Sequence, residues 1–102
     1  MADRRPVVRV QTGVRLEKRI LLVLKALAGS LDLSLGDLLE GMVLHAFEGK
    51  APFGAATLTR IRALREIYGL DLVAADSHRL TETAARPARD PAPGPRKRRP
   101  SR

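Results

Sequence analysis

The sequence predicts a mainly α-helical protein with one short N-terminal strand, assembled as an intertwined homodimer. Residues 8–16 alternate apolar and polar side chains, which is the period of a strand with one buried face. Three later segments repeat apolar residues at intervals of three and four, which is the period of helices. The chain has 102 residues and no cysteine. Because a core of about seventy residues without disulfides gains little stability alone, we expect dimerisation to supply the rest.

The two faces of the expected strand differ in character. The apolar face carries Val8, Val10, Thr12, Val14 and Leu16, and the polar face carries Arg9, Gln11, Gly13 and Arg15. Two strands alone are marginal in water, and no second strand-like run follows this one. We therefore expect the strand to pair with its copy in a second chain, as an intermolecular antiparallel β-ribbon. Such a ribbon would present the polar face twice, on a surface that suits a groove of duplex DNA.

Three helices are expected after the strand. The first follows Leu16, and its apolar residues cover nearly all of its sides, as expected of a helix buried between two chains. The second begins at Ser34, a good N-cap that has Asp37 as a partner three residues later. A third, C-terminal helix runs from about residue 55 to residue 68 and stops at Gly69.

The second helix contains two glycines, Gly36 and Gly41, in its interior. Each glycine costs about 1 kcal/mol of helix stability relative to alanine. Close approach of another helix would explain Gly41. The alternative is that the position merely tolerates glycine, which is a weak signal by itself.

The net charge of +8 is unevenly distributed along the chain. Residues 1–15 carry +3, residues 16–83 carry −1 and residues 84–102 carry +6. The helical body is therefore near neutral, and the positive charge lies where a polyanion could reach it. A second explanation fits the tail equally well. Of the 19 basic residues 15 are arginine, which is also expected if the genome uses arginine at every position that tolerates it. In addition, blocks of like charge are often only solvated tails.

The sequence offers no catalytic, cofactor or metal site. Of its two histidines, His45 borders the apolar stripe of the second helix and is expected to be partly buried, and His78 lies among polar residues. Two isolated histidines without cysteine do not make a metal site. The glycines match neither a P-loop nor a dinucleotide fingerprint. The longest strongly apolar run, residues 20–24, is far shorter than the roughly eighteen residues that a membrane span needs. We expect a cytoplasmic protein that is not an enzyme and has no secretory signal.

Residues 8–48 show a distinctive order of elements. The strand ends at Thr12–Leu16, the core positions of the first helix are Leu16, Ile20, Leu24 and Leu27, and the second helix opens at Leu33–Ser34 and continues its core with Leu38, Leu39, Met42 and Ala46. In this order the segment resembles the MetJ/Arc-like ribbon-helix-helix DNA-binding family. The resemblance implies an intertwined homodimer whose ribbon enters the major groove.

The resemblance also implies which residues contact DNA. The base-facing strand positions fall on Arg9, Gln11, Gly13 and Arg15, and the phosphate-binding positions at the N-terminus of the second helix fall on Ser34 and Leu35. Arginine can donate to guanine O6 and N7, and glutamine can pair with adenine N6 and N7. Because Gly13 has no side chain, direct readout would rest on Gln11 and Arg15. The second helix has no basic residue before Lys50, which leaves the phosphates to helix ends, the first helix and the tails.

Together these features predict a sequence-specific DNA-binding transcriptional regulator, in the simplest case a repressor, that is associated with the nucleoid. The expected organisation is a flexible basic arm at 1–7, a dimerisation and DNA-binding domain at 8–50, an additional helix and extension at 51–80, and a disordered Pro- and Arg-rich tail at 81–102. The expected partners are double-stranded DNA and a second copy of the chain, and the third helix offers a surface to a further protein. Two alternatives stay open, an antitoxin of a toxin–antitoxin pair and a dimerisation or adaptor module that does not bind DNA.

Overall fold

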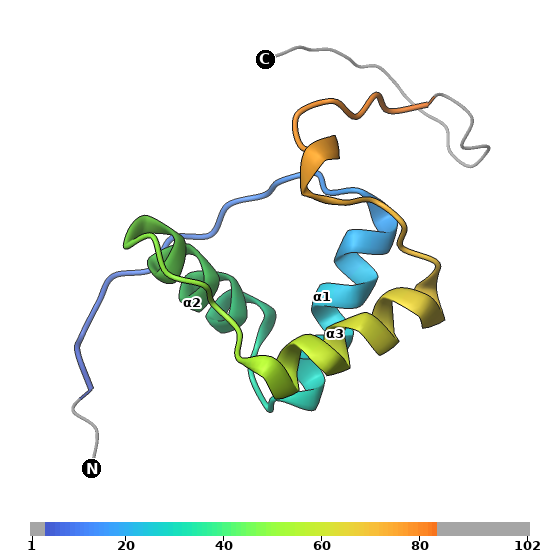
Figure 1. The fold of residues 1–102 in the computed structure, drawn as a ribbon. Helices are drawn as coiled ribbons and strands as arrows, with labels where there is room; N and C mark the ends of the chain where they lie inside the picture. Colours follow the sequence, from blue (N-terminus) through green and yellow to red (C-terminus); the bar gives the residue numbers. More distant parts are fainter. Residues whose placement is uncertain (1–3, 84–102) are drawn as a thin grey trace. The chain divides into compact units, whose positions relative to one another are not determined.

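The computed structural model describes residues 4–83 of the chain. Over these residues it contains three α-helices and one short 3-10 helix (Figure 1). The elements are α1 (Lys18–Ser30), α2 (Leu35–Phe47), α3 (Ala55–Tyr68) and the 3-10 helix η1 (Ala74–Asp76).

The chain divides into two units, Met1–Asp71 and Leu72–Arg102, which we describe separately. The three α-helices belong to the first unit. The basic tail predicted at 81–102 lies almost entirely outside the described residues. No helix among the described residues combines the length and the apolar character that crossing a membrane would require.

The strand predicted over residues 8–16 is absent. Residues 4–16 form an extended, exposed segment, and no strand or β-bridge occurs in the part of the chain that the structure describes. The predicted fold class, mainly α with an N-terminal strand that forms a ribbon, is therefore wrong for residues 4–83, which are helical without a strand. The first unit is a small helical body preceded by an extended segment. The physical reason is that alternation distinguishes two faces but provides no partner for the backbone N–H and C=O groups, and the regular elements elsewhere in residues 4–83 are all helices.

Capping residues determine where the helices begin and end. The Glu17 carboxylate accepts a hydrogen bond of 3.0 Å from the backbone N–H of Ile20 at the start of α1. The Ser34 hydroxyl accepts one of 3.1 Å from the N–H of Asp37 at the start of α2, as the sequence predicts. The stop after α3 is also as predicted, because Gly69 adopts the left-handed conformation, with φ of 66°, that glycine favours. The Glu17 cap is an addition that the sequence did not indicate.

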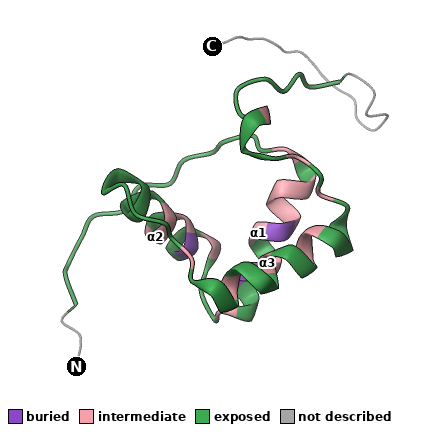
Figure 2. Cartoon of the chain, in the orientation of Figure 1, coloured by how far each residue is buried: buried purple, intermediate pink, exposed green. Residues whose placement is uncertain are grey.

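The core of the first unit is centred on α1, which packs against both α2 and α3. Its fully buried residues are Val23, Leu27 and Ala28 of α1 and Leu38 of α2. Three of these residues, Leu27, Ala28 and Leu38, form one cluster. Half-buried apolar side chains pack around it, namely Leu24, Leu31, Met42, Phe53, Ile61 and Leu64. Figure 2 shows that burial is confined to short stretches and that most of residues 4–83 are exposed. Because little apolar surface is removed from water, the core stabilises a single chain only modestly.

The two glycines inside α2 are not required by close packing within the chain. A Cβ atom added to Gly36 or Gly41 would meet no atom within 4 Å. Within the described residues, therefore, no helix approaches Gly41 closely enough to demand glycine. Of the two explanations that the sequence left open, simple tolerance fits this structure.

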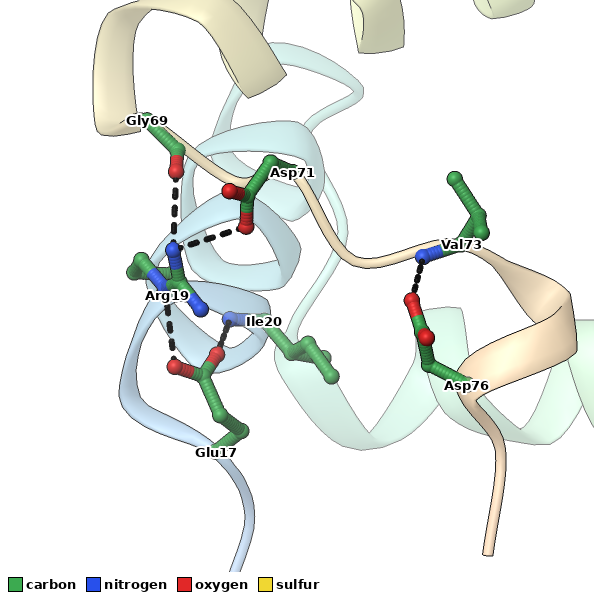
Figure 3. A network of polar contacts seen from close by, with 7 residues as sticks. All are labelled: Glu17, Arg19, Ile20, Gly69, Asp71, Val73 and Asp76. Atoms are coloured by element: carbon green, nitrogen blue, oxygen red, sulfur yellow. Dashed lines mark hydrogen bonds and ion pairs between the residues drawn. The ribbon is translucent and has the colours of Figure 1, made fainter. Parts of the chain in front are cut away.

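The second unit, in its described part, is organised around η1. The Asp76 carboxylate accepts a hydrogen bond of 2.8 Å from the backbone N–H of Val73, which closes the turn on itself (Figure 3). His78 follows with a positive φ of 66°.

Candidate nucleic-acid interface

The N-terminal segment, defined as residues 4–16, carries the densest positive charge among the described residues. It contains four arginines and no acidic residue, and all of its residues are exposed. The arginines are Arg4, Arg5, Arg9 and Arg15. Because side chains along an extended chain follow one another at about 3.3 Å, the segment presents several cations over a short length. Such a basic stripe is the electrostatic footprint of a nucleic-acid-binding surface.

Arg9 is held against the side of α2. Its Nε and Nη2 atoms each donate to one oxygen of the Glu40 carboxylate, both at 2.8 Å. These hydrogen bonds lower the pKa of the Glu40 carboxyl below its ordinary value. The two side chains keep 67% and 46% of their surface exposed, so that water and salt screen their attraction. The pair therefore keeps Arg9 beside α2, but it is weak enough for Arg9 to exchange Glu40 for another partner.

The other predicted base-facing residues, Gln11, Gly13 and Arg15, are exposed in the same segment. A Cβ atom on Gly13 would meet nothing within 4 Å, so its backbone is open to a close approach by a ligand. The predicted apolar face is exposed as well: Val8 is 93% exposed and Val10 is 82% exposed. The expected difference between a buried face and a polar face is thus not observed, because the segment packs on no core.

The predicted phosphate-binding positions lie apart from this segment. Ser34 is exposed and caps α2, and Leu35 is half-buried. Glu40, the partner of Arg9, lies about 9 Å further along the axis of α2, at 1.5 Å per residue. Ser34 accepts from the Asp37 N–H, whereas Arg9 donates to Glu40. The structure therefore brings Arg9 to a part of α2 that lies beyond the predicted phosphate-binding positions.

Arg19 forms a polar cluster that the sequence did not indicate (Figure 3). Its Nε donates to the Glu17 carboxylate at 2.9 Å, and its Nη1 donates to the Gly69 carbonyl and to the Asp71 carboxylate, each at 3.0 Å. Partial burial alone would raise the pKa of the Glu17 carboxyl, but the hydrogen bonds from Arg19 and from the Ile20 backbone lower it below its ordinary value. This cluster ties the start of α1 to the end of α3, so Arg19 serves the fold.

A shallow hollow of about 410 Å³ lies at the C-terminal end of α3. Its lining residues are Arg62, Arg65, Glu66, Gly69, Leu70 and Asp71. Two guanidinium groups and two carboxylates nearly cancel one another's charge there, and the end of a helix repels anions. The hollow is therefore a poor place for a polyanion, in contrast to residues 4–16.

An apolar surface lies on the second half of α2. We call it the α2 outer face and define it as Val43, Leu44 and Phe47, which are 43%, 63% and 80% exposed. These positions share one side of the helix, because residues three and four apart lie one above the other. Val43 and Phe47 follow the apolar period of α2, but in the structure they are exposed. Such a surface is typical of a site that contacts another protein.

His45 differs from its expected setting. It was predicted to be partly buried, yet it is exposed, and its Nδ1 lies 2.7 Å from the Gly41 carbonyl, one turn earlier in α2. This contact lies within α2 and joins His45 to a backbone carbonyl of the same helix.

No family model matches this sequence, and no curated protein or solved structure is significantly similar to it. The candidate interface is therefore argued from the residues of this chain, and the family resemblance stays a prediction.

Proposed function

We propose that this protein binds duplex DNA through residues 4–16. The observation that carries the proposal is the exposed, extended segment with four arginines and no acidic residue. Each arginine that neutralises a phosphate releases condensed counterions, which provides affinity that falls as salt rises. An extended chain is also narrow enough to follow a groove, as basic arms do in other DNA-binding proteins.

Sequence preference would come from the same segment. Arg9, Gln11 and Arg15 have the side chains that best distinguish bases by their edges, since arginine pairs with guanine and glutamine with adenine. Arg4 and Arg5 lie further toward the N-terminus and would contact phosphates. A protein that distinguishes DNA sequences in this way, without a catalytic site, fits a transcriptional regulator that represses by occupying its operator and is located on the nucleoid.

The regulator would act as a homodimer formed through the α2 outer face. Phe47 is 80% exposed and Leu44 is 63% exposed, and covering both would remove apolar surface that the small core leaves in water. A second copy presents the same surface, as a two-fold interface requires. A dimer would also place two N-terminal segments on one DNA molecule, which increases affinity through effective concentration.

The decisive experiment on DNA binding selects duplexes from a randomised pool with the full chain. We expect the wild-type protein to enrich particular sequences, and we expect Q11A/R15A to lose the enrichment by at least about tenfold while its helical circular dichroism is unchanged. R62A, which removes one exposed positive charge from α3, is the control and should keep the preference. Equal, unselective binding by the wild type and Q11A/R15A would overturn sequence reading by this segment.

The oligomeric state tests the dimer separately. Sedimentation equilibrium should show a wild-type dimer and an F47E monomer with the same helix content, because a buried carboxylate would be costly at the interface. A wild-type monomer at every concentration would refute the dimer. If the wild type is a dimer that does not bind DNA, the exposed apolar surface favours the second candidate, an adaptor module.

A further inference from the structure

The ion pair between Arg9 and Glu40 uses the same donors that Arg9 would offer to DNA. Nε and Nη2 lie on one edge of the guanidinium, and both are occupied by the two carboxylate oxygens at 2.8 Å. Arginine recognises phosphates and the guanine edge by the same two-pronged geometry. Glu40 therefore holds Arg9 in the way that a nucleic acid would.

The remaining donors of Arg9 do not avoid this conflict. A phosphate approaching through Nη1 would lie next to the Glu40 carboxylate, and like charges at that distance repel. Asp37, one turn earlier on α2, adds negative charge to the same surroundings and acts electrostatically on Arg9. The side of α2 that faces Arg9 is therefore acidic, and Arg9 must leave it to meet a polyanion.

The pair is suited to exchange because it is exposed. The Arg9 side chain keeps 67% of its surface in water and the Glu40 side chain keeps 46%. Exposed pairs of this kind contribute little to stability and are screened by salt. Their partners can therefore separate without unfolding α2 or disturbing the buried cluster around Leu27.

We propose that Glu40 is an intramolecular competitor of DNA: its carboxylate occupies the Arg9 guanidinium in the free protein and must be displaced when Arg9 binds a phosphate or a base edge. This inference rests on the proposed DNA-binding function. Glu40 is then an affinity-determining residue that contacts no DNA itself. It lowers the affinity of every DNA contact made by Arg9 by the same factor, because each such contact must first separate Arg9 from the carboxylate.

The test is a double-mutant cycle on DNA binding, with the full chain and one duplex taken from the selection. The proteins are the wild type, R9A, E40Q and R9A/E40Q. The matched control is E48Q, which removes the same charge just beyond the end of α2, where Glu48 pairs with Lys50 at 3.1 Å. Dissociation constants are measured by fluorescence anisotropy at several salt concentrations, and circular dichroism confirms that each variant is folded.

We expect E40Q to bind about two- to fivefold more tightly than the wild type, the range expected for releasing an exposed ion pair. E48Q should improve binding less, because it only changes the net charge. In the R9A background, E40Q should improve binding by no more than E48Q does in the wild type. The gain from E40Q should also shrink as salt rises, because salt already weakens the pair.

The outcomes separate the two proposals. If the wild type does not bind DNA, or if R9A binds as well as the wild type, the role of Arg9 in the proposed function fails. If R9A weakens binding but E40Q gains no more than E48Q, only the competitor fails. Weaker binding by E40Q would also overturn it, since Glu40 would then position Arg9 for DNA instead of competing for it.

Discussion

Arg9 and Arg19 both form ion pairs with glutamates, yet their surroundings differ. Arg19 donates to three acceptors on two elements, the Glu17 carboxylate, the Gly69 carbonyl and the Asp71 carboxylate. Arg9 binds a single carboxylate on the exposed side of α2. An arginine with several partners around a helix junction stabilises the fold, whereas an arginine with one exposed partner can be exchanged. The comparison separates a helical body, where substitutions should change stability, from a segment where they should change binding.

The largest effect is expected in the body. Leu27, at 2% exposure, lies at the centre of the buried cluster. Leu27→Ala should lower the free energy of unfolding by about 2–5 kcal/mol, through lost burial and the cavity that remains. Urea denaturation followed by circular dichroism measures the change. Leu44→Ala on the α2 outer face is the control at low protein concentration, where a comparable loss would show that the body and the exposed surface do not differ as described.

In the N-terminal segment the expected change is in binding. R4A/R5A should weaken DNA binding and make the plot of log K against log salt shallower by about one to two units, at roughly 0.9 per lost phosphate contact. The midpoint of urea denaturation should be unchanged. A salt titration of binding provides the slope, with R62A as the charge control. A slope as steep as that of the wild type would remove these two residues from the interface.

Ser34 tests whether the start of α2 belongs to the body or to the interface. Ser34→Ala removes the hydroxyl that accepts from the Asp37 N–H and should cost about 1 kcal/mol of stability, with Ser34→Thr restoring most of it. DNA affinity measured well below the unfolding midpoint should stay the same. If affinity fell while stability held, the phosphate contact expected from the sequence at this position would be supported instead.

Substitutions of the two α2 glycines should change the stability of the helical body by smaller amounts. Gly36→Ala should stabilise the protein by up to about 1 kcal/mol, because alanine favours the helix and the position has room. Gly41→Ala should do the same in a monomeric F47E background. If the wild type forms the proposed dimer, a loss at Gly41 alone would show that a second chain packs closely there, and sedimentation would detect the weaker association.

The smallest expected effect is a change in how the stability of the protein depends on pH. The pKa of the Glu17 carboxyl is lowered in the folded protein from an ordinary value of 4.5, so the folded state releases this proton more readily than the unfolded state. Its stabilising contribution is complete above the ordinary pKa and is lost as the pH falls through the lowered one. Glu17→Gln should therefore be less stable than the wild type near neutral pH, and the difference should disappear under acid. Arg19→Ala should reduce this pH dependence, and denaturation curves at several pH values would show it. A difference that is independent of pH would contradict this role for Glu17.

Local chemistry was readable from the sequence, and long-range partners were not. The Ser34 cap and the Gly69 stop depend on residues within a few positions, so their signals survive in a single sequence. The strand expected at 8–16 is absent from the single chain, because its expected partner edge belongs to a second copy and nothing within residues 4–83 replaces that edge. Val43 and Phe47 carry a core-like period, but nothing local tells whether the chain itself or another molecule covers them.

The residues of the candidate site could likewise be predicted only in part from the sequence. Arg9, Gln11 and Arg15 were identified by residue type and spacing, and the structure finds them exposed in one segment. Glu40 lies 31 residues from Arg9, and no period or motif links the two. Glu40 and Asp37 lie one turn apart on α2, and in the sequence both looked like ordinary solvated residues.

The Arg19 cluster has a consequence for the order of folding. The hydrogen bond from Arg19 to the Gly69 carbonyl joins residues that lie 50 positions apart in the sequence. Closing a loop of that length lowers the conformational entropy of the chain, and this cost precedes the contacts that offset it. The three helices between its ends must therefore form and dock before the guanidinium can find the end of α3. The cluster would be nearly absent from the transition state, so it would act chiefly on the rate at which the finished body opens. A few exposed hydrogen bonds can in this way extend the lifetime of a fold whose core is small.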